Sequence, residues 1–230
     1  MRLKYPAFIF ARGGSKGLPR KNVRLFNGRP LICYSIQTAL ECPSIECVYV
    51  STDDEEIAEV AGKEGAEVIV RPKELCSDTS PEILSWKHAI ELLKAGGKTL
   101  VKFISLPATS PLRNVSDVET AIEKHTVTNA DLCVAITKSS KSPYFSMVSL
   151  AQDSRVELLL SGSSAARRQD APSSYDLTTV VYVATPGYVE GCSSLFEGDV
   201  VGVEVPKERS IDIDDIFDFR FAETLMKEQG

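Results

Sequence analysis

Residues 8–22 read FIFARGGSKGLPRKN, a short apolar run that breaks into a loop rich in glycine and positive charge. The apolar part, residues 5–11, is long enough for a buried strand and too short to span a membrane. The glycines permit positive φ angles and a close approach of a ligand, so that successive backbone N–H groups can converge on phosphate oxygens. Positive charge in the loop comes from Arg12, Lys16, Arg20 and Lys21. The segment therefore predicts a polyphosphate site directly after the first strand.

The loop matches neither of the two common phosphate-binding patterns. The sequence lacks Gly-x-x-x-x-Gly-Lys-Ser/Thr, and residues 13–17 (GGSKG) do not form the Gly-x-Gly-x-x-Gly pattern of dinucleotide sites. A nicotinamide-dependent oxidoreductase is therefore a weak hypothesis. The structural alternative is a basic surface turn, which the position directly after a strand disfavours.

The composition favours a single soluble domain that binds a small anion. The 230 residues are 43% hydrophobic, enough for one sizeable core, and the net charge is −6. An acidic chain disfavours a nucleic-acid partner, and no signal peptide or membrane segment is visible. The six cysteines include no Cys-x-x-Cys pair, and only two histidines accompany them, so a zinc site is improbable. Reduced cysteines predict a cytoplasmic protein.

Strand and helix patterns alternate along most of the chain. Strands are predicted at 5–11, 46–51, 65–70, 100–106, 131–137, 178–184 and 200–205. Five helices are predicted: from Pro30 to about residue 43, from Asp53 to about 64, from Pro81 to about 95, from Ser116 to about 124, and over 215–228. Capping-box spacing pairs Asp53 with Glu56, Thr79 with Glu82, and Ser116 with Glu119. The alternation predicts an α/β fold, Rossmann-like and doubly wound, with a mainly parallel sheet.

Three polar loops, at 12–22, 71–80 and 107–113, follow predicted strands. Ligands of such sheets bind at the carboxyl ends of the strands, near the point where the strand order reverses. We therefore expect the three loops to meet on one rim. Asp53 also follows a strand, and a role near the ligand and a role as a helix cap are equally compatible with its position.

The alternation stops between residues 138 and 175, where serine, scattered charge and short apolar runs replace it. We interpret this segment as an arm inserted into one domain that spans residues 1–230. Exposed apolar side chains on an arm usually find a second subunit, which predicts a homodimer. Arg167 and Arg168 suit bidentate binding of carboxylate or phosphate, and a solvated charge cluster is the alternative.

Asp212 and Asp214 alternate with Ile211 and Ile213. In an extended backbone both carboxylates face the same way, as a magnesium ion shared with phosphates requires. The alternative is that Asp214 caps the last helix and that Asp215 and Asp218 favour its N-terminus. We favour the metal site.

Together these motifs resemble the CMP-N-acylneuraminate cytidylyltransferases, in the order of that family and across nearly the whole chain. The resemblance rests on residues 11–22, 27–31, 50–53, Arg71-Pro72, 77–79, 109–113, Arg168-Gln169 and 212–214. It implies that CTP and a nine-carbon 2-keto acid sugar give the CMP-sugar and pyrophosphate, with Mg²⁺ as cofactor. It also implies a homodimer whose arm helps to close the sugar pocket of the partner subunit.

The resemblance assigns roles to individual residues. The nucleotide-binding residues would be Arg12, Gly13, Gly14, Ser15, Lys16, Gly17, Lys21, Asn22, Arg71 and Ser80, with the last two near cytosine. The candidates for the sugar are Ser110, Arg113, Tyr144, Phe145, Arg168 and Gln169, although Tyr144 and Phe145 are as compatible with interface packing. The catalytic set would be Arg12, Lys16, Lys21, Asp212 and Asp214, with the two aspartates as metal ligands. Such chemistry is mostly positioning and electrostatics. The base that deprotonates the sugar hydroxyl stays open between a carboxylate and a metal-bound hydroxide.

The chain departs from the family pattern mainly where the sugar should lie. Pro107 stands where a sugar-contacting glutamine is expected, and Thr178-Thr179 replaces Asn-Gly. A serine run becomes Ser80-Pro81-Glu82. The nucleotide chemistry is therefore better supported than the identity of the sugar. Transfer to an eight-carbon acid of the Kdo type is one alternative, and a non-catalytic dimer that binds CTP is another, although a sensor needs no magnesium pair.

Overall fold

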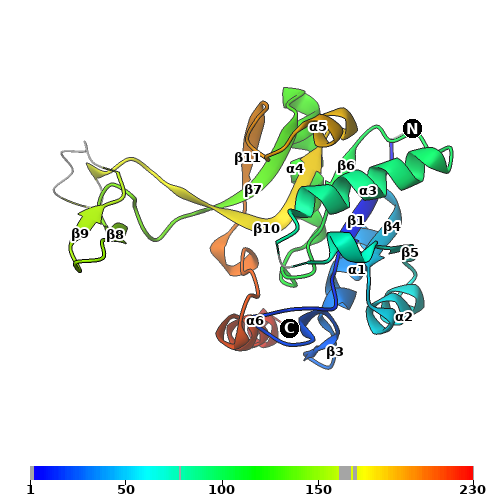
Figure 1. The fold of residues 1–230 in the computed structure, drawn as a ribbon, viewed down its shortest axis with the longest axis horizontal. Helices are drawn as coiled ribbons and strands as arrows, with labels where there is room; N and C mark the ends of the chain where they lie inside the picture. The colour runs from blue at the N-terminus through cyan, green and yellow to red at the C-terminus, as the bar shows by residue number, and fades with distance from the viewer. Residues whose placement is uncertain (1–2, 78, 161–166, 168–169, 230) are drawn as a thin grey trace.

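The computed structural model describes residues 3–77, 79–160, 167 and 170–229. Its centre is a seven-stranded sheet with the strand order β11-β7-β10-β6-β1-β4-β5 (Figure 1). The strands of this sheet are β1 Tyr5–Phe10, β4 Ile45–Thr52, β5 Glu67–Val70, β6 Phe103–Ser105, β7 Leu132–Lys138, β10 Tyr175–Ala184 and β11 Val200–Glu204. Two small antiparallel pairs are β2 Leu25–Phe26 with β3 Arg29–Pro30, and β8 Val148–Leu150 with β9 Val156–Leu158.

Neighbouring strands are parallel except at β10. β1 pairs in parallel with β4 and β6, β4 with β5, and β7 with β11. β10 runs antiparallel to both β6 and β7. The chain leaves the sheet at the end of β7 and returns beside it, where Tyr175 pairs with Lys138, so β10 must run in the opposite direction. The predicted α/β fold with a mainly parallel sheet is confirmed, with one antiparallel strand inside it.

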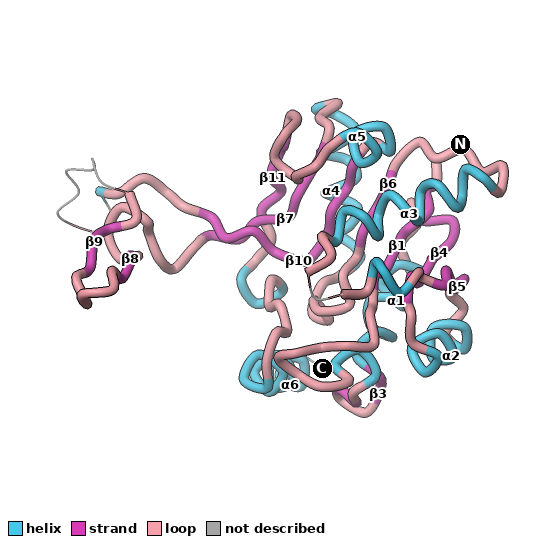
Figure 2. Tube along the Cα trace, viewed as in Figure 1, coloured by secondary structure: helices cyan, strands magenta, loops and turns pink. Residues whose placement is uncertain are grey.

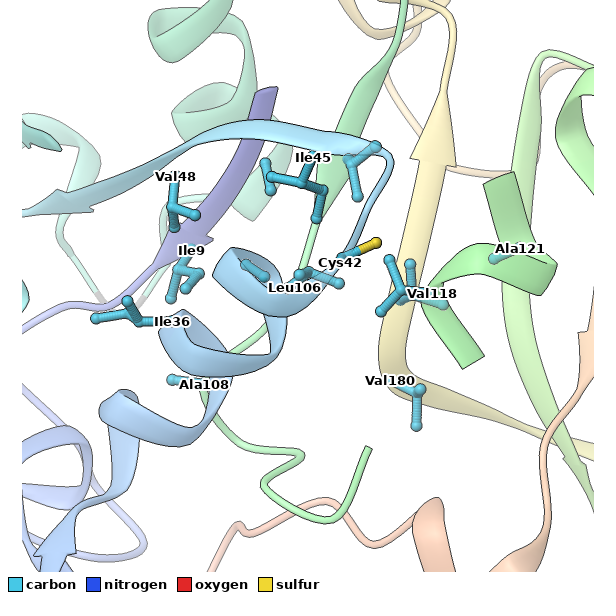
Figure 3. Close-up of a cluster of buried hydrophobic side chains, with 14 of the residues drawn as sticks. Ile9, Ile36, Cys42, Ile45, Val48, Leu106, Ala108, Val118, Ala121 and Val180 are labelled. Atoms are coloured by element: carbon cyan, nitrogen blue, oxygen red, sulfur yellow. The ribbon is translucent and has the colours of Figure 1, made fainter. Parts of the chain in front are cut away.

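Helices cover both faces of the sheet (Figures 1 and 2). They are α1 Leu31–Glu41, α2 Glu55–Lys63, α3 Glu82–Ala95, α4 Val115–Thr128, α5 Pro186–Gly191 and α6 Ile216–Gln229, with short 3-10 helices at Lys21–Val23, Lys73–Leu75 and Lys207–Arg209. Successive side chains of β1 point to opposite faces. Ile9 joins a cluster with α1, α2 and α4, part of which Figure 3 shows, whereas Phe8 joins a cluster with α3 and α5.

The second face is rich in aromatic side chains. The ring of Phe103 lies 4.9 Å from that of Phe8 and 5.0 Å from that of Trp86, between ring centroids. Phe10 packs against the same group, 6.3 Å from Trp86. These contacts fix the first turn of α3 against the carboxyl end of β1.

A third apolar cluster holds the glycine-rich loop in place. Leu18 of the loop packs with Phe26, with Phe219 of α6 and with Ile213, which is fully buried. The amide of Ile213 also donates to the carbonyl of Thr109, at 2.9 Å. Burial of Ile213 therefore positions the residues on either side of it, Asp212 and Asp214, beside the loop.

The three predicted capping boxes are wrong in position. α2 is capped by Asp54, whose carboxylate accepts from the amide of Ile57, and not by Asp53. α4 has a capping box of Asn114 and Asp117 rather than Ser116 and Glu119. α3 follows Pro81 and has no side-chain cap, so the Thr79 and Glu82 pair does not form. The caps of α2 and α4 lie within two residues of the predicted ones, because several polar residues compete at each helix start.

The β8–β9 hairpin lies at the end of an extension that projects away from the sheet (Figure 1). Its pairing joins Val148 to Leu158 and Leu150 to Val156. Large apolar side chains are exposed on it, namely Phe145, Met147, Val148, Leu150, Val156, Leu158, Leu159 and Leu160. This is the segment that the sequence predicts as an arm.

All six cysteines lie in the described part of the chain, and none of them forms a disulfide bond there. None of the helices in the described ranges is both long and apolar enough to cross a membrane.

Candidate functional site

A cleft of about 470 Å³ opens at the carboxyl ends of β1, β5 and β6. The lining comes from segments far apart in the sequence: residues 10–22, 71–85, 107–109, Thr179 and 212–214. The three polar loops that we expected on one rim therefore meet here. The volume is that of a typical small-molecule site.

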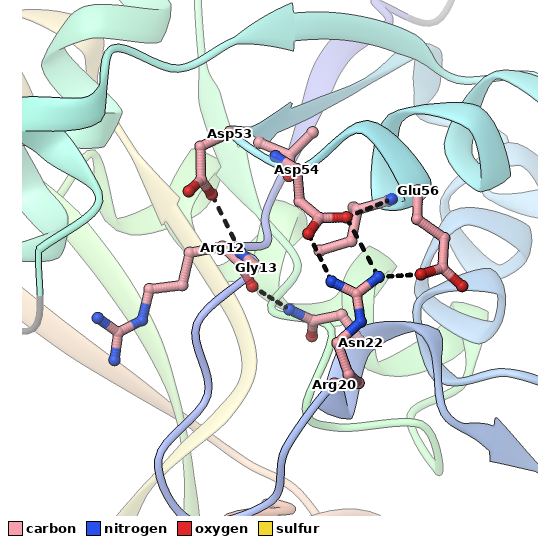
Figure 4. A network of polar contacts seen from close by, with 9 residues as sticks. Arg12, Gly13, Arg20, Asn22, Asp53, Asp54 and Glu56 are labelled. Atoms are coloured by element: carbon pink, nitrogen blue, oxygen red, sulfur yellow. Dashed lines mark hydrogen bonds and ion pairs between the residues drawn. The ribbon is translucent and has the colours of Figure 1, made fainter.

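The glycine-rich loop forms one wall of the cleft, and Asp53 orders its first turn. The Asp53 carboxylate accepts a hydrogen bond from the amide of Gly13, at 3.0 Å (Figure 4). A side chain at Gly13 would collide with Asp54, and one at Gly17 would collide with the backbone carbonyl of Asp214. A methyl group at Gly14 would meet no atom within 4 Å. Close approach therefore requires glycine at two of the three positions.

The expected positive φ angles do not occur at these glycines. Among the described residues, the glycines with positive φ are Gly28, Gly65 and Gly97, and the residue of the loop in the left-handed region is Arg20, with φ of 56°. The loop reaches its shape through contacts with Asp53, Asp54 and Asp214 rather than through glycine-specific torsion angles.

Three of the four predicted cations face the cleft, namely Arg12, Lys16 and Lys21. Arg20 does not, because its guanidinium pairs with Asp54, at 2.5 Å, and with Glu56 of α2 (Figure 4). Asn22 lines the cleft and donates to the carbonyl of Arg12, at 3.1 Å. Arg20 thus fixes the loop to the start of α2, and Asn22 joins the two ends of the loop.

Asp212 and Asp214 both line the cleft, as their alternation predicts. The Asp212 carboxylate is largely buried, and its Oδ1 meets no donor among the described residues. Burial raises the pKa of Asp212, and hydrogen bonds from Thr109 and Thr179 act in the opposite direction. Asp214 is exposed, with its Oδ1 3.5 Å from Nζ of Lys21.

The alternative role of Asp214 as a helix cap does not hold. The carboxylate of Asp215 accepts from the amides of Phe217 and Asp218 at the start of α6, at 2.7 and 3.1 Å. The Asp218 carboxylate accepts in turn from the amides of Asp214 and Asp215. The Asp214 side chain is left facing the cleft.

The aspartate pair fits a hard divalent cation. An unpartnered, buried carboxylate oxygen on Asp212 and an exposed carboxylate on Asp214 are the oxygen donors that Mg²⁺ prefers. No group of three or more His, Cys, Asp or Glu side chains in the described part of the chain could hold a metal. Phosphate oxygens and water would therefore complete the coordination, as is usual for magnesium at nucleotide sites.

Arg71 and Ser80 also line the cleft. The Arg71 guanidinium is buried and donates to the hydroxyl and the carbonyl of Ser51, at 3.1 and 2.7 Å. Burial lowers the pKa of Arg71, and its guanidinium carbon lies 5.6 Å from the centre of the Phe10 ring. The Ser80 hydroxyl is buried and has no partner among the described residues. A ligand with its own donors and acceptors would satisfy it.

Ser110 and Arg113 are buried behind the residues that line the cleft, so contact with the sugar stays a prediction for both. The Ser110 hydroxyl lies 2.7 Å from that of Thr179, and the Arg113 guanidinium donates to the carbonyls of Pro107 and Thr179. Complete burial lowers the pKa of Arg113 to about 9. Both residues hold the backbone of the wall in place.

Tyr144 and Phe145 belong to the arm and do not line the cleft of their own chain. Arg168 and Gln169 lie outside the described residues. Tyr144 and Phe145 are therefore not brought to this cleft by the structure of one chain.

The sequence interpretation missed two carboxylates that shape the site. The sequence spacing predicts a capping role for Glu82, yet its side chain lines the cleft. Asp54 both caps α2 and fixes Arg20. A signal existed for Glu82, because it is the first helical residue after the polar loop at 71–80, which we placed on the ligand rim.

Comparison with known proteins agrees with this geometry. The profile of the family described as "Cytidylyltransferase" matches residues 7–185. The chain is 32% identical over 226 residues to the "Pseudaminic acid cytidylyltransferase" of Campylobacter jejuni, covering 98% of this chain and 97% of the relative. It is 34% identical over 226 residues to the "CMP-N,N'-diacetyllegionaminic acid synthase" of Legionella pneumophila, covering 96% and 95%.

Solved structures show the same fold. One of a CMP:2-keto-3-deoxy-manno-octonic acid synthetase complexed with CTP matches with a TM-score of 0.74 at 17% identity, over 99% of this chain and 100% of that chain. At that identity the likeness concerns the fold alone. The family profile and the two near full-length relatives confirm the resemblance found in the motifs: the chain belongs to the cytidylyltransferase family.

Proposed function

We propose that this protein transfers CMP from CTP to the anomeric hydroxyl of a nonulosonate, a nine-carbon 2-keto-3-deoxy sugar acid, and releases pyrophosphate. The observation that carries the proposal is the cleft itself. It unites a cationic glycine-rich loop with an aspartate pair in a chain that aligns, over nearly its full length, with relatives named for pseudaminic and legionaminic acid.

The triphosphate lies on the glycine-rich loop in this proposal. Arg12, Lys16 and Lys21 face the cleft and would bind its oxygens, and the loop amides add further donors. Asp212 and Asp214 would hold magnesium, which supplies charge neutralisation on the phosphates when bound. Lys21 also contacts the segment of the two aspartates. Its Nζ donates to the carbonyl of Ile213, the residue between Asp212 and Asp214, at 2.6 Å.

The reaction needs the sugar hydroxyl in line with the α-phosphorus. The hydroxyl oxygen forms the new bond to phosphorus, the bond from phosphorus to the pyrophosphate oxygen breaks, and the hydroxyl proton passes to a basic group. The cleft wall at Pro107, Ala108 and Thr179 adjoins Asp212 and has no charged side chain of its own. We place the sugar there, where Ser110 and Arg113 fix the wall from behind. This placement assigns them a positioning role.

A homodimer is part of the proposal. The hairpin of the arm exposes Val148 and Leu158, which are 53% and 43% exposed, on a segment that projects from the sheet. Cover by a second copy removes that apolar surface from water. The arm residues Tyr144, Phe145, Arg168 and Gln169 would then act on the cleft of the partner subunit. A cytoplasmic location belongs to the proposal because the absence of disulfide bonds among the described cysteines fits a reducing compartment.

Pyrophosphate release tests the function. The purified protein, with magnesium and each of the four nucleoside triphosphates, is assayed against pseudaminate, legionaminate, N-acetylneuraminate, the deaminated nonulosonate and Kdo. We expect release with CTP and one nine-carbon acid. Release with Kdo alone would favour the eight-carbon alternative. No pyrophosphate release with any of these acids, together with a melting temperature that CTP still raises, would favour a non-catalytic CTP-binding dimer.

A further inference from the structure

Glu82 is a carboxylate inside the cleft to which the reaction described above gives no role. It is the first residue of α3, and its side chain lines the cleft, as do those of Arg71 and Asp212. Its Oε1 accepts from the indole N–H of Trp86, at 3.3 Å, and Trp86 is itself fixed by the aromatic cluster under the sheet. Trp86 therefore holds the Glu82 carboxylate in one orientation, because Trp86 is itself held by the side chains around it.

Glu82 has no cationic partner in an ion pair among the described residues. No ion pair joins it to any residue in the described ranges, and the nearby Arg71 guanidinium is already bonded to Ser51. Packing of the protein against one side of the carboxylate raises the pKa of Glu82, whereas the residue as a whole is exposed and lines the cleft. The side chain thus has acceptor capacity that a donor from a ligand can fill.

Charge decides which part of the substrates can lie there. The phosphates and the sugar carboxylate are anions, so contact with Glu82 would repel them. The base of the nucleotide is neutral and flat. Phe10 and Leu75 offer it apolar surface, and the Ser80 hydroxyl, two residues before Glu82, is buried without a partner among the described residues. A flat group with both donors and acceptors on its edge suits this end of the cleft.

Cytosine and uracil differ at the edge that Glu82 would meet. Cytosine carries an amino group that donates, whereas uracil carries a carbonyl oxygen that only accepts. A carboxylate accepts from the amino group and repels the carbonyl oxygen. We propose that Glu82 is the residue that selects CTP over UTP in this protein, by accepting a hydrogen bond from the amino group of cytosine. This inference rests on the proposed function, because it requires the nucleotide to occupy the cleft.

The test compares wild type with Glu82→Gln, which keeps the size of the side chain and its acceptor for Trp86. The carboxamide can also donate to the carbonyl of uracil. We expect the ratio of kcat/KM for CTP to that for UTP to fall at least tenfold in Glu82→Gln, through weaker use of CTP and stronger use of UTP. Glu91→Gln is the matched control, since Glu91 is exposed on the same helix, and its ratio should equal that of wild type.

A binding measurement separates this inference from the proposed function. Calorimetric titration with CMP and with UMP needs neither sugar nor turnover, and the ratio of the two Kd values should shift at least tenfold toward UMP in Glu82→Gln. If wild type releases no pyrophosphate yet the Kd ratio shifts, the function fails and the role of Glu82 stands. If wild type is active and neither the kcat/KM ratio nor the Kd ratio shifts in Glu82→Gln, Glu82 does not distinguish cytosine from uracil.

An equal loss of turnover with CTP and UTP would also overturn the inference and assign Glu82 to catalysis or to the fold. Glu82→Ala provides a second variant should Glu82→Gln fold poorly. It should lose selectivity for CTP without gaining turnover of UTP, because alanine offers no donor to the uracil carbonyl.

Discussion

Gly17→Ala probes the contact between the glycine-rich loop and the metal-binding segment. A methyl group at this position would lie 2.2 Å from the Asp214 carbonyl oxygen, well inside the van der Waals contact distance, and this backbone atom cannot rotate away. Relief of that clash requires the two segments to separate by about 1 Å, and a displacement of this size at a reacting centre costs roughly 100-fold in rate. We therefore expect kcat/KM for CTP to fall by roughly 100-fold.

Gly14→Ala is the comparison for this experiment. It adds the same methyl group to the same loop, where no atom lies within 4 Å, and Gly14 does not have a positive φ. Its loss should be far smaller than that of Gly17→Ala. The assay is pyrophosphate release at saturating sugar acid, with the melting temperature as a check on folding. Equal losses in both variants, or wild-type activity in Gly17→Ala, would refute the coupling of the loop to Asp214.

Three further predictions concern the loop, the buried histidine and the arm. Asp53→Ala removes the acceptor of the Gly13 amide and should raise KM for CTP about fivefold, in line with the ~1 kcal/mol of one exposed charge-assisted hydrogen bond; an unchanged KM would mean that Asp53 does not order the loop. His125 lies 2.7 Å from Nζ of Lys102, and burial followed by that charge lowers its pKa from 6.5 to about 4. Because the unfolded chain binds the proton on this histidine more readily, the contribution of His125 to the free energy of unfolding should be at its full value above pH 6.5. It should fall by up to about 3 kcal/mol as the pH drops to 4. Urea melts of His125→Gln should show a weaker dependence on pH, and the same dependence as in wild type would contradict this prediction. The double variant Val148→Asp with Leu158→Asp should reduce the mass measured by light scattering to the 25.1 kDa of one chain. The control Val127→Asp changes an exposed residue of α4 and should stay dimeric. If the wild-type protein itself has the mass of one chain, the proposed dimer is wrong.

The sequence predicts the order of elements and the location of the site because both follow from local patterns. Residues 8–22 show a strand that ends in a cationic glycine loop, and the alternation of Asp212 and Asp214 around a buried Ile213 places both carboxylates in one cleft. These features depend on neighbouring residues and on the rule that ligands meet the carboxyl ends of parallel strands.

Features set by distant contacts are not visible in the sequence. Arg20 looks like a phosphate ligand until Asp54 and Glu56, more than thirty residues away, are seen to bind it. The family resemblance assigns Ser110 and Arg113 to the sugar, and only the fold shows that both side chains are buried. The antiparallel direction of β10 follows from the return of the arm along β7, which no local pattern encodes.

Detection of the product by mass spectrometry tests the central claim most directly. Wild type, Asp212→Asn and Asp214→Asn are incubated with CTP, magnesium and the acid that gives pyrophosphate release. The account predicts a CMP adduct of that acid with wild type, and loss of most of it in both variants while they stay folded. Consumption of CTP without an adduct, or near-normal adduct formation in both variants, would contradict the assignment of this cleft as a metal-assisted site for transfer of CMP to a sugar acid.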